Sequence, residues 1–166
     1  MTGRPRSAAT PALRVLERAG VDHEVIGFDS AASPPSGYGT EAAEVLGLEP
    51  AEVFKTLMVQ LPDGTLAAAV VPVSGTLDLR AAAAALGVKK VALADPAVAE
   101  RRTGYVVGGI SPVGQRHPVP TVVDASALDL PRIHVSAGQR GLEVRLAPED
   151  LVAVTSAAVA RIAASR

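Results

Sequence analysis

The near absence of aromatic side chains is the strongest constraint on how this chain can fold. The sequence holds two Phe, two Tyr and no Trp among 166 residues, although 48% of its residues are hydrophobic. A core must therefore be built from closely packed Ala, Val, Leu and Ile side chains. The length suits one compact domain, which we expect over residues 10–166, preceded by a flexible segment over residues 1–9.

Composition also excludes several kinds of site. The chain has no Cys, so it cannot form a disulfide, a thiolate nucleophile or a Cys-ligated metal site. His23, His117 and His134 are far apart and follow none of the familiar metal-site spacings. No signal peptide or membrane-spanning run is recognisable, so we expect a cytoplasmic protein.

The charge is close to balanced but unevenly distributed. The formal net charge is -1, yet Lys55 is the only base in the acidic stretch 19–64, whereas bases outnumber acids over 80–145. The second half could face an anion. Tight autonomous binding to nucleic acid needs several phosphate contacts, so we expect any binding to RNA to be weak or assisted.

Capping residues and hydrophobic periodicity predict a mixture of helices and strands. We expect helices at 11–19, 40–46 and 79–86, a helix starting at Asp95-Pro96, and a last helix from 148 to about 163. We expect strands at 23–28, 54–61, 66–73, 90–93, 105–109, 121–124, 132–136 and 142–146. The predicted fold class is α/β (α+β), with a mixed, largely antiparallel, barrel-like sheet and helices packed outside it.

Lys55 and Thr56 are the first candidates for a functional role. They lie in an apolar strand, where period-2 alternation places Lys55 on the face of Leu57 and Val59. An ammonium near the core could serve a ligand. From the pattern alone, a lysine at the start of a strand that extends to water is slightly favoured, and Thr56 could be an ordinary strand threonine.

Other candidates lie in Gly-rich or aromatic surroundings. Gly108 and Gly109 open a Gly-Gly-Ile-Ser-Pro segment whose backbone amides could approach a carbonyl or phosphate, although the pattern alone favours a structural turn. Ser136 precedes another glycine loop and could line a pocket, although the pattern alone favours an ordinary turn serine. Phe28 and Tyr38 flank a Ser/Pro/Gly-rich loop, where they could wall a pocket or anchor the core.

These signals occur in an order that resembles the YbaK family of tRNA-editing proteins, relatives of the editing domain of bacterial prolyl-tRNA synthetase. The resemblance covers roughly residues 10–163. It rests on Thr10-Pro11-Ala12, Tyr38-Gly39, Phe54-Lys55-Thr56-Leu57, Lys89-Lys90-Val91, Ala94-Asp95-Pro96, the segment from Thr103 to Gln115, and the segment from Val135 to Leu142.

The resemblance implies a small α/β protein whose pocket holds the aminoacyl ester at the 3′ end of tRNA. Lys55 matches the key lysine of the family, with Thr56 assigned beside it to the catalytic site. The implied substrate-binding positions are Phe28, Tyr38, Gly108, Gly109, Ser136 and Gly138. Phe28 stands where relatives often have Tyr, and Tyr38 stands where they often have Phe, so both aromatic rings are kept while the hydroxyl group changes place. Glu143 stands where some members of the family have Asp.

The implied activity is trans-editing hydrolysis of Cys-tRNA(Pro), in which the thiol of the substrate attacks its own ester. Lys55 would position the substrate, while Gly108 and Ser136 would stabilise the ester oxygen. The implied partners are the acceptor end of tRNA(Pro) and, transiently, prolyl-tRNA synthetase, with no cofactor, metal, membrane or DNA. Two alternatives remain open, a sister deacylase for Ala-tRNA(Pro) or another small amino acid, and a non-catalytic module that binds a tRNA end or a synthetase.

Overall fold

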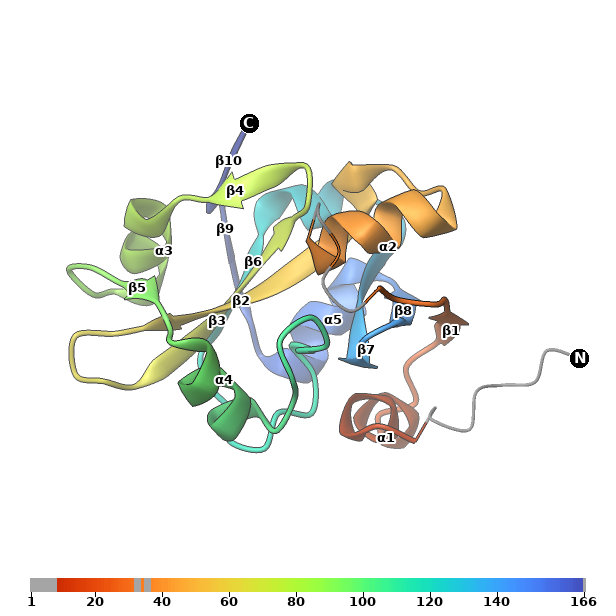
Figure 1. Cartoon of the computed structure of the whole chain (residues 1–166). Helices are drawn as coiled ribbons and strands as arrows, with labels where there is room; N and C mark the ends of the chain where they lie inside the picture. Colours follow the sequence, from red (N-terminus) through yellow and green to blue (C-terminus); the bar gives the residue numbers. More distant parts are fainter. Residues whose placement is uncertain (1–8, 32–33, 35–36, 166) are drawn as a thin grey trace, which may run out of the picture.

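The structure is a computed structural model that describes residues 9–31, 34 and 37–165 (Figure 1). The predicted flexible segment 1–9 therefore lies, except for Ala9, outside the described residues. Helices are interspersed with single strands and with runs of two or three consecutive strands, and most of the strand pairs are antiparallel. The mixed, largely antiparallel α/β fold predicted from the sequence is confirmed.

The largest sheet has five strands in the order β5-β2-β3-β6-β9. Its members are β5 (Ala92–Leu93), β2 (Phe54–Gln60), β3 (Leu66–Pro72), β6 (Thr121–Asp124) and β9 (Ala158–Ala160). The β2–β3 hairpin is antiparallel, whereas β3–β6 and β6–β9 are parallel. Every residue of β3 is buried, because small Ala and Val side chains allow close packing on both faces of this central strand.

A second sheet has three strands in the order β1-β8-β7, formed by β1 (His23–Gly27), β8 (Leu142–Leu146) and β7 (Ile133–Gln139). A separate pair joins β4 (Gly75–Leu77) to β10 (Ala163–Ser165). The two larger sheets meet where Val53, just before β2, forms an isolated bridge with His134 in β7. The sheets do not join into one closed barrel, so the expected barrel-like sheet is open.

Helices cover the sheets on several sides (Figure 1). They are α1 (Pro11–Arg18), α2 (Tyr38–Leu46), α3 (Leu79–Leu86), α4 (Pro96–Thr103) and α5 (Pro148–Thr155), with short 3₁₀ turns η2 (Pro50–Glu52) and η3 (Ala125–Asp129). One apolar cluster joins α1 and α5 to β7 and β8, and another packs α3 on the five-stranded sheet. The largest fully buried side chains are Leu, Ile and Val, as the aromatic-poor composition predicts.

The predicted strand at 105–109 is wrong, because this segment forms a turn. The N–H of Gly109 donates to the carbonyl of Val106 at 2.8 Å. The N–H of Val107 donates to Glu100 Oε2, and its carbonyl accepts from Arg140 Nε, both at 2.8 Å. Side chains therefore satisfy backbone groups that would otherwise pair in a sheet ladder.

The last predicted helix is too long, and the helix at 40–46 begins earlier than predicted. Helix α5 ends at Thr155, because Ser156 adopts a left-handed conformation with φ of 53°. The chain beyond it forms β9 and β10. Helix α2 begins at Tyr38, because Gly37, with φ of 89°, provides the turn into the helix and its carbonyl accepts from Glu41 N.

Candidate functional site

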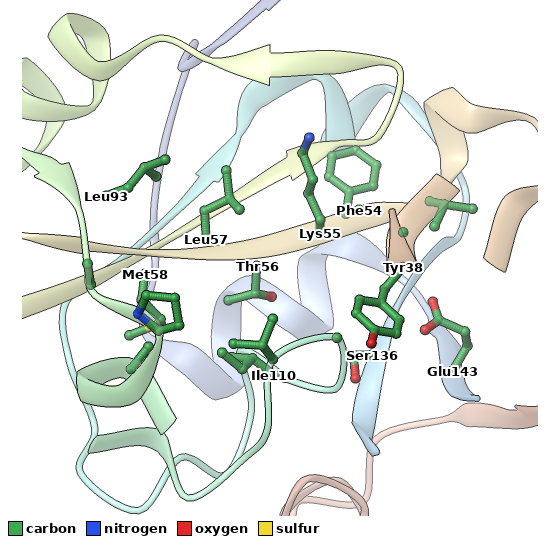
Figure 2. A pocket seen from close by; sticks show the side chains of 17 residues that line it. Tyr38, Phe54, Lys55, Thr56, Leu57, Met58, Leu93, Ile110, Ser136 and Glu143 are labelled. Carbon is green, nitrogen blue, oxygen red and sulfur yellow. The ribbon is translucent and has the colours of Figure 1, made fainter. Parts of the chain in front are cut away.

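A pocket of about 300 Å³ lies at the gap between the two larger sheets (Figure 2). Its wall combines β2, the start of α2, the segment from β5 into α4, the 107–110 turn, and facing positions on β7 and β8. The lining residues are Tyr38, Gly39, Val53, Phe54, Lys55, Thr56, Leu57, Met58, Leu93, Ala94, Pro96, Ala99, Val107, Gly108, Ile110, Ser136 and Glu143. Most of this wall is apolar, so its few polar groups determine what a ligand can do there.

The pocket follows an open edge of β2. On one side β2 pairs with β3 along its whole length, whereas β5 meets the other side only at Val59 and Gln60. The carbonyl of Met58 faces this second side, because it accepts from Ala94 N at 2.9 Å. Backbone groups alternate along a strand, so the N–H and C=O of Thr56 also face this side, where no strand pairs with them in the described structure.

Lys55 and Thr56 leave β2 in opposite directions (Figure 2). Lys55 shares a side with Leu57, as the alternation predicts, whereas Thr56 points to the side that holds Tyr38, Ser136 and Glu143. The hydroxyl oxygen of Thr56 is buried and has no hydrogen-bond partner. Unpaired buried hydroxyls cost free energy, so this group and the open backbone beside it are candidate contacts for a ligand.

The turn at Gly108 forms another part of the wall. Gly108 has φ of 89°, and a Cβ atom built on it would lie 2.6 Å from the ring of Tyr38. Arg140 joins both elements, because its Nε donates to Val107 O and its guanidinium carbon lies 4.8 Å from the centroid of the Tyr38 ring. The carbonyl that Arg140 binds belongs to the peptide that carries the Gly108 N–H, which therefore points away from Arg140.

Ser136 and Glu143 face each other across β7 and β8. The hydroxyl oxygen of Ser136 accepts from Gly138 N at 3.1 Å across a bulge in β7, which leaves the hydroxyl hydrogen to donate. Glu143 is buried, with a relative exposure of 8% for the whole residue. Burial raises the pKa of its carboxyl from 4.5 to about 8, because a desolvated carboxylate is unfavourable.

The structure brings together five of the candidate residues that sequence reasoning identified. Lys55, Thr56, Tyr38, Gly108 and Ser136 all line the pocket. Three others do not line it, and each has a packing role. Phe28 packs against the apolar cluster of α2 and Val53, a Cβ on Gly109 would meet the backbone of Gln139 and Arg140, and one on Gly138 would meet the ring of Tyr105.

Several wall residues give no sequence signal of a site. Leu57, Met58, Leu93 and Ile110 look like ordinary core positions in the sequence, and they become pocket residues only because β5 and β7 leave the edge of β2 open. Glu143 alternates with Leu142 and Val144, a pattern that is typical of a solvent-facing acid. Glu143 is identified only through the family resemblance, because it stands where some members of the family have Asp.

The described residues contain no obvious side-chain nucleophile with a general base. Ser136 lines the pocket, but no hydrogen bond joins it to His134, which does not line the pocket. Burial lowers the pKa of His134, with a further contribution from Arg145. Within the described chain, no group of three or more His, Asp or Glu side chains could hold a metal ion. None of the described helices has the length and apolarity needed to cross a membrane.

Fold and site together define a mixed α/β protein with a ligand pocket at the open edge of a sheet. The chain belongs to the aminoacyl-tRNA editing domain family, whose model matches residues 35–154. The resemblance to YbaK-type editing proteins is thereby confirmed.

Individual relatives are similar to this chain over nearly its whole length. An Enterococcus faecalis (strain ATCC 700802 / V583) protein named "Putative Cys-tRNA(Pro)/Cys-tRNA(Cys) deacylase EbsC" is 35% identical over 153 residues, or 92% of each chain. A solved structure described as "a putative trans-editing enzyme for prolyl tRNA synthetase" is 27% identical with a TM-score of 0.81, covering 98% of this chain and all 100% of its own. The solved "hypothetical protein APE2540" is 27% identical with a TM-score of 0.83, covering 93% of this chain and 100% of its own.

Proposed function

We propose that this protein hydrolyses mischarged aminoacyl-tRNA in trans, with Cys-tRNA(Pro) as its substrate. The observation that carries the proposal is the pocket at the edge of β2, where unpaired donors surround a small apolar space. A volume of about 300 Å³ suits an amino acid and its ester linkage, at the lower end of ordinary ligand pockets. The body of the tRNA would lie outside.

The wall supports a reaction in which the substrate supplies the nucleophile. The cysteine thiol loses its proton, and the sulfur attacks the carbonyl carbon of its own ester. The carbon–oxygen bond to the ribose then breaks, and the ribose oxygen takes up a proton. Water hydrolyses the resulting thiolactone to free cysteine, so the protein need provide only position and charge stabilisation.

The open donors are placed to stabilise the oxygen on which negative charge develops. The candidates are the hydroxyl of Ser136, the N–H of Gly108 and the N–H of Thr56, each without an acceptor among the described residues. Lys55 lines the same pocket from the other side of β2. In this proposal its ammonium binds the ribose-phosphate end of the substrate, and Thr56 holds the ester beside it.

The proposal is tested by measuring deacylation of Cys-tRNA(Pro), Ala-tRNA(Pro), Pro-tRNA(Pro) and Cys-tRNA(Cys). We expect fast loss of the cysteinyl ester from tRNA(Pro), and a fall in kcat/KM of about a hundredfold or more in Lys55→Ala. Lys90→Ala removes an exposed lysine outside the pocket and is expected to retain full activity.

Each other outcome has a defined meaning. Preference for the alanyl ester would assign the protein to the sister activity. Binding of the charged tRNA without turnover would indicate a binding module. Normal activity in Lys55→Ala would remove Lys55 from the site.

We also propose that prolyl-tRNA synthetase supplies tRNA identity in a transient complex. A protein with a formal net charge of -1 has little electrostatic attraction for a tRNA body, which supports assistance by a partner. The complex would form in the cytoplasm, where tRNA is charged. Addition of the synthetase should increase the preference for Cys-tRNA(Pro) over Cys-tRNA(Cys), and an unchanged ratio would contradict the complex.

A further inference from the structure

Glu143 is a buried acid whose carboxyl has no charged partner among the residues that the structure describes. The residue lines the pocket and is 8% exposed. Across the sheet it faces Ser136 on β7 and Ile26 on β1. Within the described chain, no hydrogen bond or ion pair meets its carboxyl. A buried carboxyl in this condition destabilises the fold when it ionises, so its position needs a reason beyond packing.

The polar groups around Glu143 make it distinctive in this pocket. It is the only acid among the described lining residues. The backbone N–H groups of Thr56 and Gly108 are donors to an anion or a carbonyl, and Lys55 is a cation. The hydroxyl oxygen of Ser136 already accepts from Gly138. A cationic group of a ligand would therefore find its strongest acceptor at Glu143, where low local dielectric strengthens the attraction.

An aminoacyl ester carries one such cation, its α-ammonium group, close to the ester carbonyl. We propose that Glu143 is the specificity residue that binds the α-ammonium of the esterified amino acid, so that the pocket selects aminoacyl esters over neutral acyl esters. This inference rests on the proposed function. It assigns to Glu143 a role in recognising the backbone of the esterified amino acid, whereas the rest of the wall contacts the side chain of that amino acid.

The carboxyl proton of Glu143 is accounted for whether the α-amine of the substrate arrives neutral or charged. If the amine arrives neutral, the proton of the Glu143 carboxyl moves to it and forms the ion pair. If the amine arrives as an ammonium, the carboxyl proton leaves to water as the ligand binds. In the complex the buried acid therefore gains an opposite charge, which no described residue of the protein provides.

The test compares two substrates that differ only at the α position. One is Cys-tRNA(Pro), and the other is its α-hydroxy analogue, which keeps the thiol and ester but has no ammonium. Glu143→Gln keeps the size and hydrogen-bonding capacity of the side chain without its charge. We expect this variant to lose about tenfold or more in kcat/KM on Cys-tRNA(Pro), and to hydrolyse the analogue within about twofold of the wild type.

Two further variants separate recognition from folding. Glu143→Asp keeps the carboxyl and should keep the preference of the wild type for the ammonium substrate, even if both rates fall. Glu17→Gln alters an exposed acid outside the pocket and should change neither rate. Thermal unfolding of each variant checks that it is folded at the assay temperature.

The remaining outcomes overturn the proposal. Equal losses on both substrates in Glu143→Gln would show that Glu143 supports the ester itself or the fold, for instance by donating to the ester carbonyl as a neutral acid. Unchanged rates of Glu143→Gln on both substrates would show that the Glu143 carboxyl does not contact the α position of the bound amino acid. If the wild type hydrolysed no charged tRNA, the proposed function would fail and the inference with it, a result distinct from active wild type with an indifferent Glu143.

Discussion

The ring of Tyr38 packs directly against Gly108, with Cγ and Cδ2 each 2.6 Å from the place where a Cβ on Gly108 would stand. The start of α2 and the turn after α4 therefore meet with no room for a side chain between them. Arg140 lies on the same ring and holds the same turn through Val107. One wall of the pocket thus depends on three residues that are distant in sequence.

Replacing Gly108 with Ala should distort this wall. The added methyl group would collide with Tyr38, and the left-handed backbone of Gly108 would also be strained. We expect kcat/KM for the aminoacyl ester to fall about tenfold or more, because small displacements of positioned donors are costly in catalysis. Steady-state deacylation and thermal unfolding are the measurements.

Gly87→Ala is the matched control for Gly108→Ala. Gly87 also has a positive φ, of 72°, but a Cβ there would meet nothing within 4 Å. It should therefore lose roughly 1–2 kcal/mol of stability through backbone strain and retain its activity. If both variants lost activity equally, the contact between Gly108 and Tyr38 would not be what shapes the pocket.

Arg140→Lys should weaken substrate binding more than it slows the reaction. Lysine keeps the positive charge but lacks the planar group that stacks on Tyr38 and the Nε that binds Val107. The stacking contact is worth about 0.5–1 kcal/mol at an exposed site, so KM should rise roughly two- to fivefold with little change in kcat. Arg18→Lys, on an exposed position of α1, provides the comparison, and a selective fall in kcat would contradict the expectation.

The stability of the protein should depend on pH through Glu143. The folded protein holds a proton at Glu143 up to about pH 8, whereas the unfolded chain releases it near 4.5. The folded state binds more protons in this window, so stability present below pH 4.5 is lost as the pH rises towards 8.

Glu143→Gln should remove this dependence. Melting temperatures of wild type and variant should diverge between pH 5 and 8, and the variant should gain about 5 °C or more relative to the wild type at the upper end. Glu17→Gln should follow the wild type throughout. Parallel curves for wild type and Glu143→Gln would show that the carboxyl ionises normally in the folded state.

Local sequence signals predict the elements whose stabilising contacts are themselves local. Helices α1, α3 and α4 begin where Thr10, Asp78 and Asp95 cap them. The β2–β3 hairpin follows its alternation and turn residues. The strand predicted at 105–109 and the helix predicted to continue to about 163 are wrong, because the groups that hold these segments, Glu100, Arg140 and Asp124, are side chains whose position no local pattern reveals.

At the site, too, the sequence predicts some features and not those that depend on distant contacts. Lys55, Thr56, Gly108 and Ser136 could be chosen because their spacing matches a family, and in the structure all four line the same pocket. Their geometry could not be predicted, since the open edge of β2 arises from where β5 and β7 stop pairing. The burial of Glu143 likewise depends on the contact between two sheets and not on its own strand.

Asp124 is the residue that fixes the C-terminal strands in place, and its replacement should loosen them. Its Oδ1 accepts the N–H groups of Ile162 and Ala163 at 2.8 and 2.9 Å, and its Oδ2 accepts from Ser126. Burial by itself would raise the pKa of Asp124, but the hydrogen bonds to Ser126, Ile162 and Ala163 together hold it below its ordinary value of 3.8. Because the folded-state pKa is lowered, the stability contributed by the carboxylate is present above pH 3.8 and lost as the pH falls further.

Asp124→Asn places an amide N–H₂ where Ser126 now donates, so we expect a loss of about 1–3 kcal/mol at neutral pH. In denaturant unfolding, the difference in the free energy of unfolding between the variant and the wild type should narrow as the pH falls below 4. Asp129→Asn changes an exposed acid at the end of η3, the 3₁₀ turn that Asp124 caps, and should be close to neutral at every pH. Deacylation by the folded Asp124→Asn protein should be normal, because Asp124 does not line the pocket. A gap that persisted unchanged into acid would mean that the shape of the side chain, and not its charge, anchors the C-terminal strands.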